Sequence, residues 1–324
     1  SPPPEARTTN THETFVAAAP APRVPQSPGE WSELRSKWLD ALNKKTFAGW
    51  PESNGRPELR KVFSASRQGL RFQAWDFLSQ SNVTLRLYTL QRSGFFKPQN
   101  VELTLSGTDG LNIAEEPLRA PNFAEWVATL RLTFKDELLE EADTLNANEI
   151  EQVTEGRLNS WRAWLETNNT TMAFLAPRGL GLNRWTGDER KLTQIRRRFM
   201  LLGQTLDGMR VWDIRNGLQC LRSIPEYKEI PVSLSGKGEM ASDALLAALF
   251  DEKVKRLDLY TLPETFMQGA DYLNILRIVD VPQVVSMVAE KTVVTLHGHS
   301  RADWLYPRKV AANLNWKSGQ FGEE

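Results

Sequence analysis

The chain has 324 residues, 40% of them hydrophobic, and its 40 basic side chains are matched by 40 acidic ones. That length can bury one large core, and the zero net charge argues against a general nucleic-acid-binding protein, which normally carries a basic excess. The single cysteine, Cys220, excludes an internal disulfide and a four-thiol metal site. Because no apolar run approaches the roughly 20 residues of a membrane-spanning helix, we expect a soluble chain with neither a membrane nor nucleic acid as its partner.

Residues 1–28 differ in composition from the rest of the chain. They contain seven of the 18 prolines and no periodic apolar pattern, so they bury little surface and are typical of an extended linker. A linker at this place predicts an upstream module of the same polypeptide as a partner. The compartment stays open, because a signal peptide for export would also lie upstream.

Regular structure is predicted to begin with a helix. Ser27 and Glu30 form a capping-box pattern, with Pro28 at the first helical position. Apolar residues then recur at helical spacing at Trp31, Leu34, Trp38 and Leu42. The predicted divisions are the linker 1–28, an N-terminal helical segment over 29–67 and one large domain over 68–324.

Residues 69–90 form the first strand pattern of the large domain. Two apolar runs flank the polar turn at 79–82, which is the signature of two strands joined by a tight connection. We therefore expect an antiparallel hairpin at the N-terminal edge of the sheet.

Strands and helices are then predicted to alternate. Five short apolar runs stand at 101–105, 171–175, 230–235, 254–260 and 291–296. Helical patterns stand at 122–140, 188–204, 207–222, 239–251 and 305–314. This alternation predicts an α/β fold with a mostly parallel sheet and helices on both faces. In such sheets ligand sites form at the carboxyl ends of the strands, so the turns that follow the strands are the candidate site.

The turns carry a family resemblance. Ser106 and Gly107 follow one strand, a Pro-Arg-Gly-x-Gly turn at 177–181 follows the next, and Trp212-Asp213 precede the turn at 235–241. In this order and spacing, over about residues 68–316, the chain resembles the α/β-hydrolases, most closely their acetyl xylan esterase-like or dienelactone-hydrolase-like branch. The resemblance implies the α/β-hydrolase fold, serine ester hydrolysis as the family activity, and Ser106 and Gly107 in the place of the oxyanion loop.

The nucleophile position departs from the family pattern. The family's serine occupies a strained turn between a strand and a helix and needs small residues on both sides. Aligning Gly236 with the first small residue puts Gly238 on the nucleophile position and Met240 on the second small one. Glycine accepts the strained backbone but offers no hydroxyl.

Two other registers of this turn stay open. One puts Lys237 on the nucleophile position, where it forms no acyl-enzyme useful for ester hydrolysis. The other puts Ser235 there, flanked by Ser233 and Lys237, although a lysine is bulky for a position that needs a small residue. The ordinary alternative for Ser235 is a strand-end hydroxyl that bonds a local backbone group.

The acid and the base are predicted by the resemblance alone. Asp303 takes the place of the family's acid in the loop after the seventh strand, with a helix cap or a surface carboxylate as the alternative. The family's histidine follows the final strand, and no histidine follows His299 in this sequence. A base role for His299 is therefore a weak alternative to a structural one. His297 and His299 lack a third ligand at a motif-like spacing, so we expect no metal site and no cofactor.

Two functions remain as hypotheses. The first is a degenerate domain, non-catalytic by itself, that acts as an accessory or ligand-binding module of a larger protein and binds a carbohydrate or acetyl ester. The alternative is an active carboxyl or acetyl ester hydrolase that uses Ser235, or whose site is completed by a missing upstream region.

Overall fold

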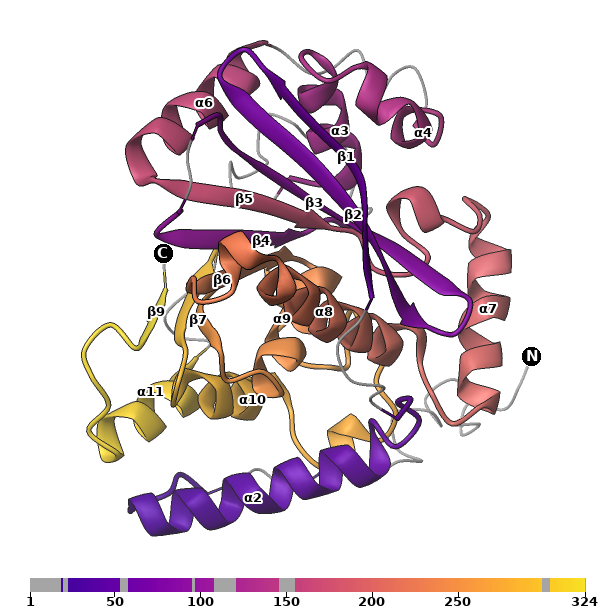
Figure 1. Cartoon of the computed structure of the whole chain (residues 1–324). Coiled ribbons are helices and arrows are strands. Elements are labelled where there is room, and N and C mark those ends of the chain that lie inside the picture. Colours follow the sequence, from indigo (N-terminus) through magenta and orange to yellow (C-terminus); the bar gives the residue numbers. More distant parts are fainter. Residues whose placement is uncertain are drawn as a thin grey trace.

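The computed structural model describes residues 19, 23–52, 58–94, 97–107, 121–145, 155–298 and 304–323, which form a nine-stranded sheet covered by helices (Figure 1). The strand order is β1-β2-β3-β5-β4-β6-β7-β8-β9. The strands are β1 (Leu59–Arg67), β2 (Leu70–Gln80), β3 (Val83–Arg92), β4 (Asn100–Leu105), β5 (Thr170–Leu175), β6 (Val232–Lys237), β7 (Val254–Tyr260), β8 (Val293–His297) and β9 (Phe321–Glu323). The α-helices are α2 (Pro28–Lys45), α3 (Phe123–Arg131), α4 (Leu139–Ala142), α6 (Glu155–Asn168), α7 (Glu189–Leu201), α8 (Leu206–Ser223), α9 (Glu239–Leu249), α10 (Val281–Ala289) and α11 (Leu305–Asn313).

The pairing in the sheet changes once from antiparallel to parallel. Strands β1, β2, β3 and β5 are antiparallel neighbours, whereas every neighbouring pair from β5 to β9 is parallel. Parallel neighbours need crossover connections, which the helices between these strands supply. The mostly parallel sheet predicted from the five apolar runs is therefore confirmed.

The predicted hairpin over 69–90 is confirmed as β2 and β3, with Ser81 and Asn82 as its connection. Asn82 has φ 63°, a left-handed conformation that asparagine tolerates better than most residues. Its predicted place at the edge is wrong, because β1 pairs with the outer side of β2.

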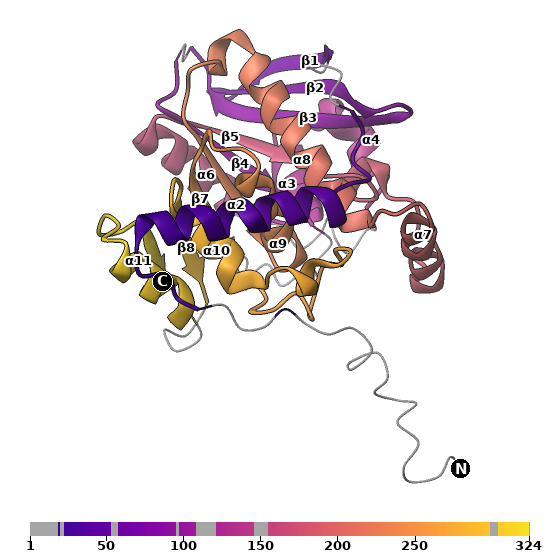
Figure 2. The same cartoon turned by 90° about the horizontal axis from the view of Figure 1, so that it is seen from below.

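The helical prediction over 29–67 holds only for its first part. The Ser27 side chain accepts a hydrogen bond from the Glu30 amide, and α2 runs from there to Lys45. Figure 2 shows α2 crossing over α9 and α10, and Arg35 of α2 lies 3.0 Å from a carboxylate oxygen of Glu290 just after α10. Residues 59–67 instead form β1, whose alternate side chains are half-buried, a period of two that its charged and polar residues conceal in the sequence.

Most of the linker lies outside the described residues, so its predicted extended form stays a prediction. Two of its described residues contact the body of the protein. The Ala19 amide donates to the Leu276 carbonyl at 2.7 Å, and Asn313 Nδ2 donates to the Pro25 carbonyl at 3.0 Å.

The two faces of the sheet are separated by adjacent residues of β5. The ring of Phe174 stacks with Trp126 of α3 and Trp161 of α6, at centroid distances of 5.2 and 5.7 Å. The next residue, Leu175, faces α8, where a Cβ added to Gly217 would lie 2.5 Å from a Leu175 methyl carbon. Helices α3 and α6 therefore cover one face and α8 the other.

Several element boundaries differ from the sequence predictions. The helix expected over 122–140 ends at Arg131. Phe134 then packs in the core, where its ring centroid lies 5.1 Å from that of Phe72. Helices α6 and α10 and the short strand β9 were not predicted. Among the described residues, no helix is long and apolar enough to cross a membrane.

Candidate functional site

A sharp turn connects β6 to α9 at the carboxyl edge of the sheet. Gly238 stands at this turn with φ 57° and ψ −122°, outside the left-handed basin that other residues can occupy. Its amide donates to the Tyr260 carbonyl at 3.0 Å, and its carbonyl accepts from the Ala241 amide at 3.1 Å. The backbone at Gly238 thus has the strain that a nucleophile turn imposes, and the residue carries no side chain to react.

Gly236 is required by the close approach of two backbone segments. A Cβ added to Gly236 would lie 2.4 Å from the Met240 carbonyl oxygen and 2.7 Å from its carbonyl carbon. Neither atom belongs to a flexible side chain, so any larger residue at this position must move the start of α9. Position 236 therefore requires glycine, the small residue that the family pattern also has there.

The position that the resemblance gives to the second small residue holds the long side chain of Met240. Met240 is 3% exposed, and its Cγ would lie 3.2 Å from a Cβ added to Gly107. The adjacent Ser106 is fully buried, and its amide donates to the Leu175 carbonyl at 3.0 Å. The Met240 side chain therefore occupies the space between the turn and the loop that the resemblance assigns to the oxyanion.

Ser235 lies within β6 and not at the turn. Its Oγ is 3.2 Å from Thr104 Oγ1 on the neighbouring strand β4. Thr104 pairs with Phe174 in register, so both hydroxyls lie on the sheet face covered by α3 and α6. Ser235 lies in register with Asp258 of β7, and Asp258 lies in register with Thr295, two residues before His297. The backbones of Ser235 and His297 are therefore two strands and two residues apart, a separation of roughly 11–12 Å. That separation exceeds hydrogen-bonding reach for a serine–imidazole pair.

His297 is held by neighbours on its own face of the sheet. Its Nε2 lies 3.1 Å from Asp258 Oδ1, and its ring stacks on Tyr260 at a centroid distance of 4.3 Å. Burial acts to raise the pKa of Asp258, but hydrogen bonds and charge from His297 and Arg256 outweigh it and lower the pKa. These contacts give His297 a structural role.

The remaining predicted site residues lie outside the described part of the chain. These are His299 and Asp303, so the predicted acid and the weaker base are not placed relative to Gly238. β9 ends at Glu323, and residues 300–324 contain no histidine.

An ion-pair network lies over the first turn of α9. Arg196 of α7 contacts carboxylate oxygens of three residues, Asp207 at 3.1 Å, Asp271 at 3.0 Å and Glu239 at 3.4 Å. Arg210 contacts the other oxygen of Asp207 at 2.8 Å. Glu239 follows Gly238 directly, so α7 is tied to the residue that begins α9.

This network was missed by the sequence prediction. In the sequence, the Arg196-Arg197-Arg198 run is typical of a solvated helix face that needs no partner. That holds for Arg197 and Arg198, which are exposed, but it is wrong for Arg196. The carboxylates stand 11 to 75 residues away in the sequence, and no local pattern links them to α7.

A buried carboxyl group completes this region. Asp243 of α9 is fully buried, and the Tyr272 hydroxyl donates to its Oδ1 at 2.6 Å. In the part of the chain that the structure describes, its Oδ2 has no hydrogen-bond partner. Burial, reinforced by the charge of Asp207, raises the pKa of Asp243 well above its usual value, so the carboxyl is neutral well above the usual range for aspartate.

A second buried ion pair joins two of the sequence motifs. Arg178, in the turn after β5, binds Asp213 of α8 through its backbone amide at 2.9 Å and through Nε and Nη2 at 2.8 and 2.7 Å. Ser79 donates to the same carboxylate at 2.6 Å, and Trp212 Nε1 donates to the Ser79 carbonyl at 2.9 Å. The Pro-Arg-Gly turn and the Trp-Asp pair thus form one network with the end of β2.

A cavity borders the ion-pair network. It has a volume of about 330 Å³, and its walls include the apolar side chains Met200 and Phe266 together with Asp271 and Tyr272. Its size lies at the lower end for small-molecule sites. Within the described part of the chain, no group of three or more histidine, cysteine or acidic side chains is arranged to hold a metal ion.

Comparison with known proteins identifies the fold. No protein-family model matches the sequence, and no curated protein matches it at a significant level. Among solved structures, the chain is similar to a Bacteroides fragilis protein assigned as an acetyl xylan esterase, with a TM-score of 0.67, 14% identity, and 98% of this chain and 82% of that chain covered. It is also similar to a glucuronoyl esterase of Solibacter usitatus, with a TM-score of 0.58, 10% identity, and 94% and 87% covered.

A third similar structure is a glucuronoyl esterase of Teredinibacter turnerae, with a TM-score of 0.51, 12% identity, and 90% and 75% of the two chains covered. At these identities the likeness establishes the architecture. The chain has the α/β-hydrolase fold, and the resemblance to acetyl xylan esterases that the turns indicated is confirmed at the level of fold.

The crowding at Gly236 predicts a stability difference between two glycine positions. Gly236→Ala should lower the free energy of unfolding by about 1–3 kcal/mol, because the new methyl group meets backbone atoms. Gly322→Ala is the matched control, since an added Cβ there meets nothing within 4 Å, and its effect should stay within about 0.5 kcal/mol. Urea unfolding measures both, and equal midpoints for the two variants would contradict the crowding.

The buried carboxyl of Asp243 predicts a pH dependence. Because its folded pKa is raised, the stability of its neutral form is fully present below the unfolded pKa of about 3.9 and is lost as the pH rises toward the folded pKa. Asp243→Asn should therefore gain stability relative to the unmodified chain as the pH rises, by up to about 1.4 kcal/mol per pH unit.

Urea unfolding at several pH values between about 4.5 and 8 measures this difference. Asp40→Asn, at an exposed position of α2, provides the matched control and should show no comparable trend. A difference between the Asp243→Asn variant and the unmodified chain that does not change with pH would show that the carboxyl ionises alike in both states.

Proposed function

We propose that the chain is an α/β-hydrolase-fold domain that forms no acyl-enzyme at its β6–α9 turn and acts as an accessory or ligand-binding module of a larger protein. The observation that carries the proposal is Gly238, which stands at the turn with φ 57° and ψ −122° and has no side chain. Covalent ester hydrolysis needs a hydroxyl or thiol at that point. Gly238 supplies neither.

The other candidate nucleophile supports the same proposal. Ser235 is 7% exposed, lies within β6, and has its hydroxyl beside Thr104. His297, the only histidine in the described residues, is two strands away and bound to Asp258. Ester hydrolysis by Ser235 would need a base from outside the described part of the chain.

The surroundings of the turn also favour a non-catalytic site. The Met240 side chain packs against Gly107, where a substrate oxygen would have to approach the oxyanion donors. Glu239 puts a negative charge beside the same place, held there by Arg196. An oxyanion that develops near Glu239 would be repelled, so the arrangement opposes the transition state of ester hydrolysis.

The module's ligand is proposed from the cavity beside Asp271 and Tyr272. Apolar walls formed by Met200 and Phe266 next to the Asp271 carboxylate suit a ring with hydroxyl groups, since sugars combine an apolar face with polar edges. The similar structures are named for acetyl xylan and glucuronoyl ester substrates. We therefore assign a carbohydrate or an acetylated carbohydrate as the ligand class.

The proposal predicts no ester turnover. The unmodified chain should hydrolyse p-nitrophenyl acetate no faster than a heat-unfolded sample, because loss of a triad member typically lowers kcat by about 10⁴- to 10⁶-fold. Gly238→Ser should remain inactive in the same assay, since no imidazole among the described residues reaches the turn.

Two serine variants of β6 provide the contrast for this assay. Ser235→Ala and its matched control Ser233→Ala remove hydroxyls from the same strand and the same face. Turnover by the unmodified chain that Ser235→Ala abolishes and Ser233→Ala preserves would establish the active-hydrolase alternative.

A further inference from the structure

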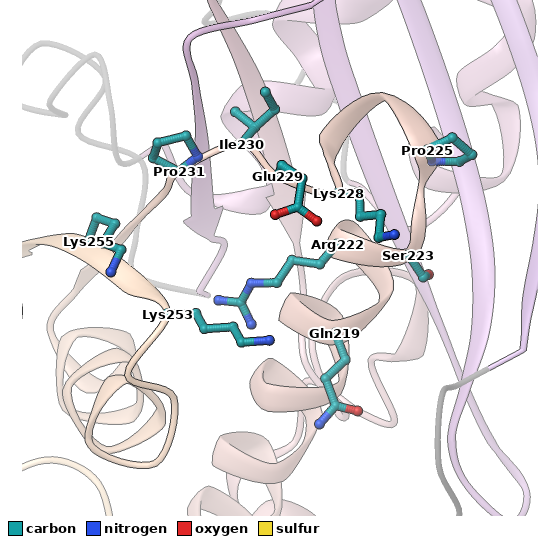
Figure 3. Close-up of a pocket in the computed structure, with 10 residues that line it drawn as sticks. All are labelled: Gln219, Arg222, Ser223, Pro225, Lys228, Glu229, Ile230, Pro231, Lys253 and Lys255. Carbon is teal, nitrogen blue, oxygen red and sulfur yellow. The ribbon is translucent and has the colours of Figure 1, made fainter.

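A second and larger cavity lies at the opposite edge of the sheet from Gly238. It has a volume of about 770 Å³ and opens between the end of α8, the residues that precede β6 and the first residues of β7. Four of its lining residues are cations, Arg222, Lys228, Lys253 and Lys255 (Figure 3). None of these positions belongs to the turns that carry the family resemblance.

The Arg222 guanidinium has a hydrogen-bonding edge that is not used. Its Nη1 donates to Asp251 at 2.5 Å, whereas Nη2 is buried and has no hydrogen-bond partner among the described residues. Figure 3 shows this guanidinium in the middle of the labelled side chains that line the cavity. A buried donor without a partner lowers the stability of the fold by about 1–3 kcal/mol. An acceptor bound at Nη2 would remove this penalty.

The lysines of the cavity are not neutralised by nearby carboxylates. No ion pair of Lys228, Lys253 or Lys255 occurs within the described residues. Of the acidic residues next to them in sequence, Glu226 binds Arg71 and Glu252 binds Lys291 and Arg35.

The cavity keeps an excess of positive charge after its negative groups are counted. Against the four cations stand Glu229, which lines the cavity, and Asp251, which holds Arg222. The ends of α8 and α9 add about half a negative charge each, and basic residues commonly compensate such ends. About one positive charge is left after this compensation, in a chain whose formal charge is zero.

We propose that this cavity binds a small multivalent oxyanion, one that carries at least two phosphate or carboxylate groups. One anionic group accepts from Arg222 Nη2, and the second is neutralised by Lys253 and Lys255. Arginine offers donors in a fixed planar fork, and lysines add point charges, a combination suited to such groups. The site is separate from the carbohydrate cavity, so the test of this site does not depend on the function proposed above.

Isothermal titration calorimetry of the full chain tests this site with inorganic pyrophosphate and with citrate as probes, at low salt and at about 0.15 M salt. At least one probe should bind with a Kd below about 1 mM, more weakly at the higher salt. Binding of pyrophosphate alone would assign phosphate groups to the ligand, and binding of citrate alone would assign carboxylates. Failure of both probes to bind at about 10 mM would overturn the proposal.

Charge-reversal variants separate a defined site from diffuse attraction. Lys253→Glu and Lys255→Glu should each weaken binding by about tenfold or more, because a charge near the anion changes sign. Lys191→Glu, at an exposed position of α7 away from the cavity, should change the Kd less than about twofold. Equal weakening by Lys191→Glu would mean that the probes respond to overall charge and would refute the site.

Arg222→Lys tests the unused donor. Lysine keeps the positive charge, but its ammonium cannot serve Asp251 and the ligand in the geometry of the guanidinium fork. We expect a loss of about tenfold or more in affinity, with the urea midpoint checked to confirm that the variant is folded. Unchanged affinity in a folded Arg222→Lys variant would overturn the assignment of Nη2 to the ligand.

Discussion

The close approach of the Gly236 and Met240 backbones determines the geometry of the carboxyl edge. Only glycine fits at position 236, and the turn then forces Gly238 into a conformation that other residues adopt at a cost. This turn sets the direction in which α9 leaves the sheet. The directions of Glu239 and Asp243 on α9 follow from it, and so does the packing of Met240 against Gly107.

Electrostatics at the start of α9 differ from those that ester hydrolysis needs. A helix N-terminus favours negative charge, and in an esterase that preference would serve the oxyanion. Here Glu239 supplies the negative charge itself, and Arg196 ties it to Asp207 and Asp271. The favourable end of the helix is therefore used within the protein, which agrees with a module that holds its ligand without transforming it.

The parallel strands β4 to β8 could be predicted from the sequence because each of them is an apolar run that ends in a glycine or proline turn. β1 was missed because its outer position leaves it half-buried and rich in charge. Its sequence therefore has the apolar pattern of neither a strand nor a helix. Gly236 and Gly238 could be located because the strained turn restricts residue types so strongly. Ser235 was left open, and only the strand register shows that it points to a sheet face and not to the turn.

The charged clusters could not be predicted for a different reason. The Arg196 network and the cavity around Arg222 each join residues far apart in the chain, and a single charged side chain carries no sign of its partner. By contrast, Arg178 and Asp213 were noticed separately through the family resemblance. Their contact is a property of the fold, since it requires the turn after β5 and α8 to meet beside the end of β2.

The central claim is that the folded chain has no activated nucleophile. Incubation with a fluorophosphonate probe, which reacts with activated serines, followed by intact mass spectrometry tests this most directly, with an active serine esterase as the positive control. The account predicts an unchanged mass for the chain under conditions in which the control is fully labelled. A single stoichiometric adduct that peptide mapping places on Ser235, or on any other residue, would contradict it.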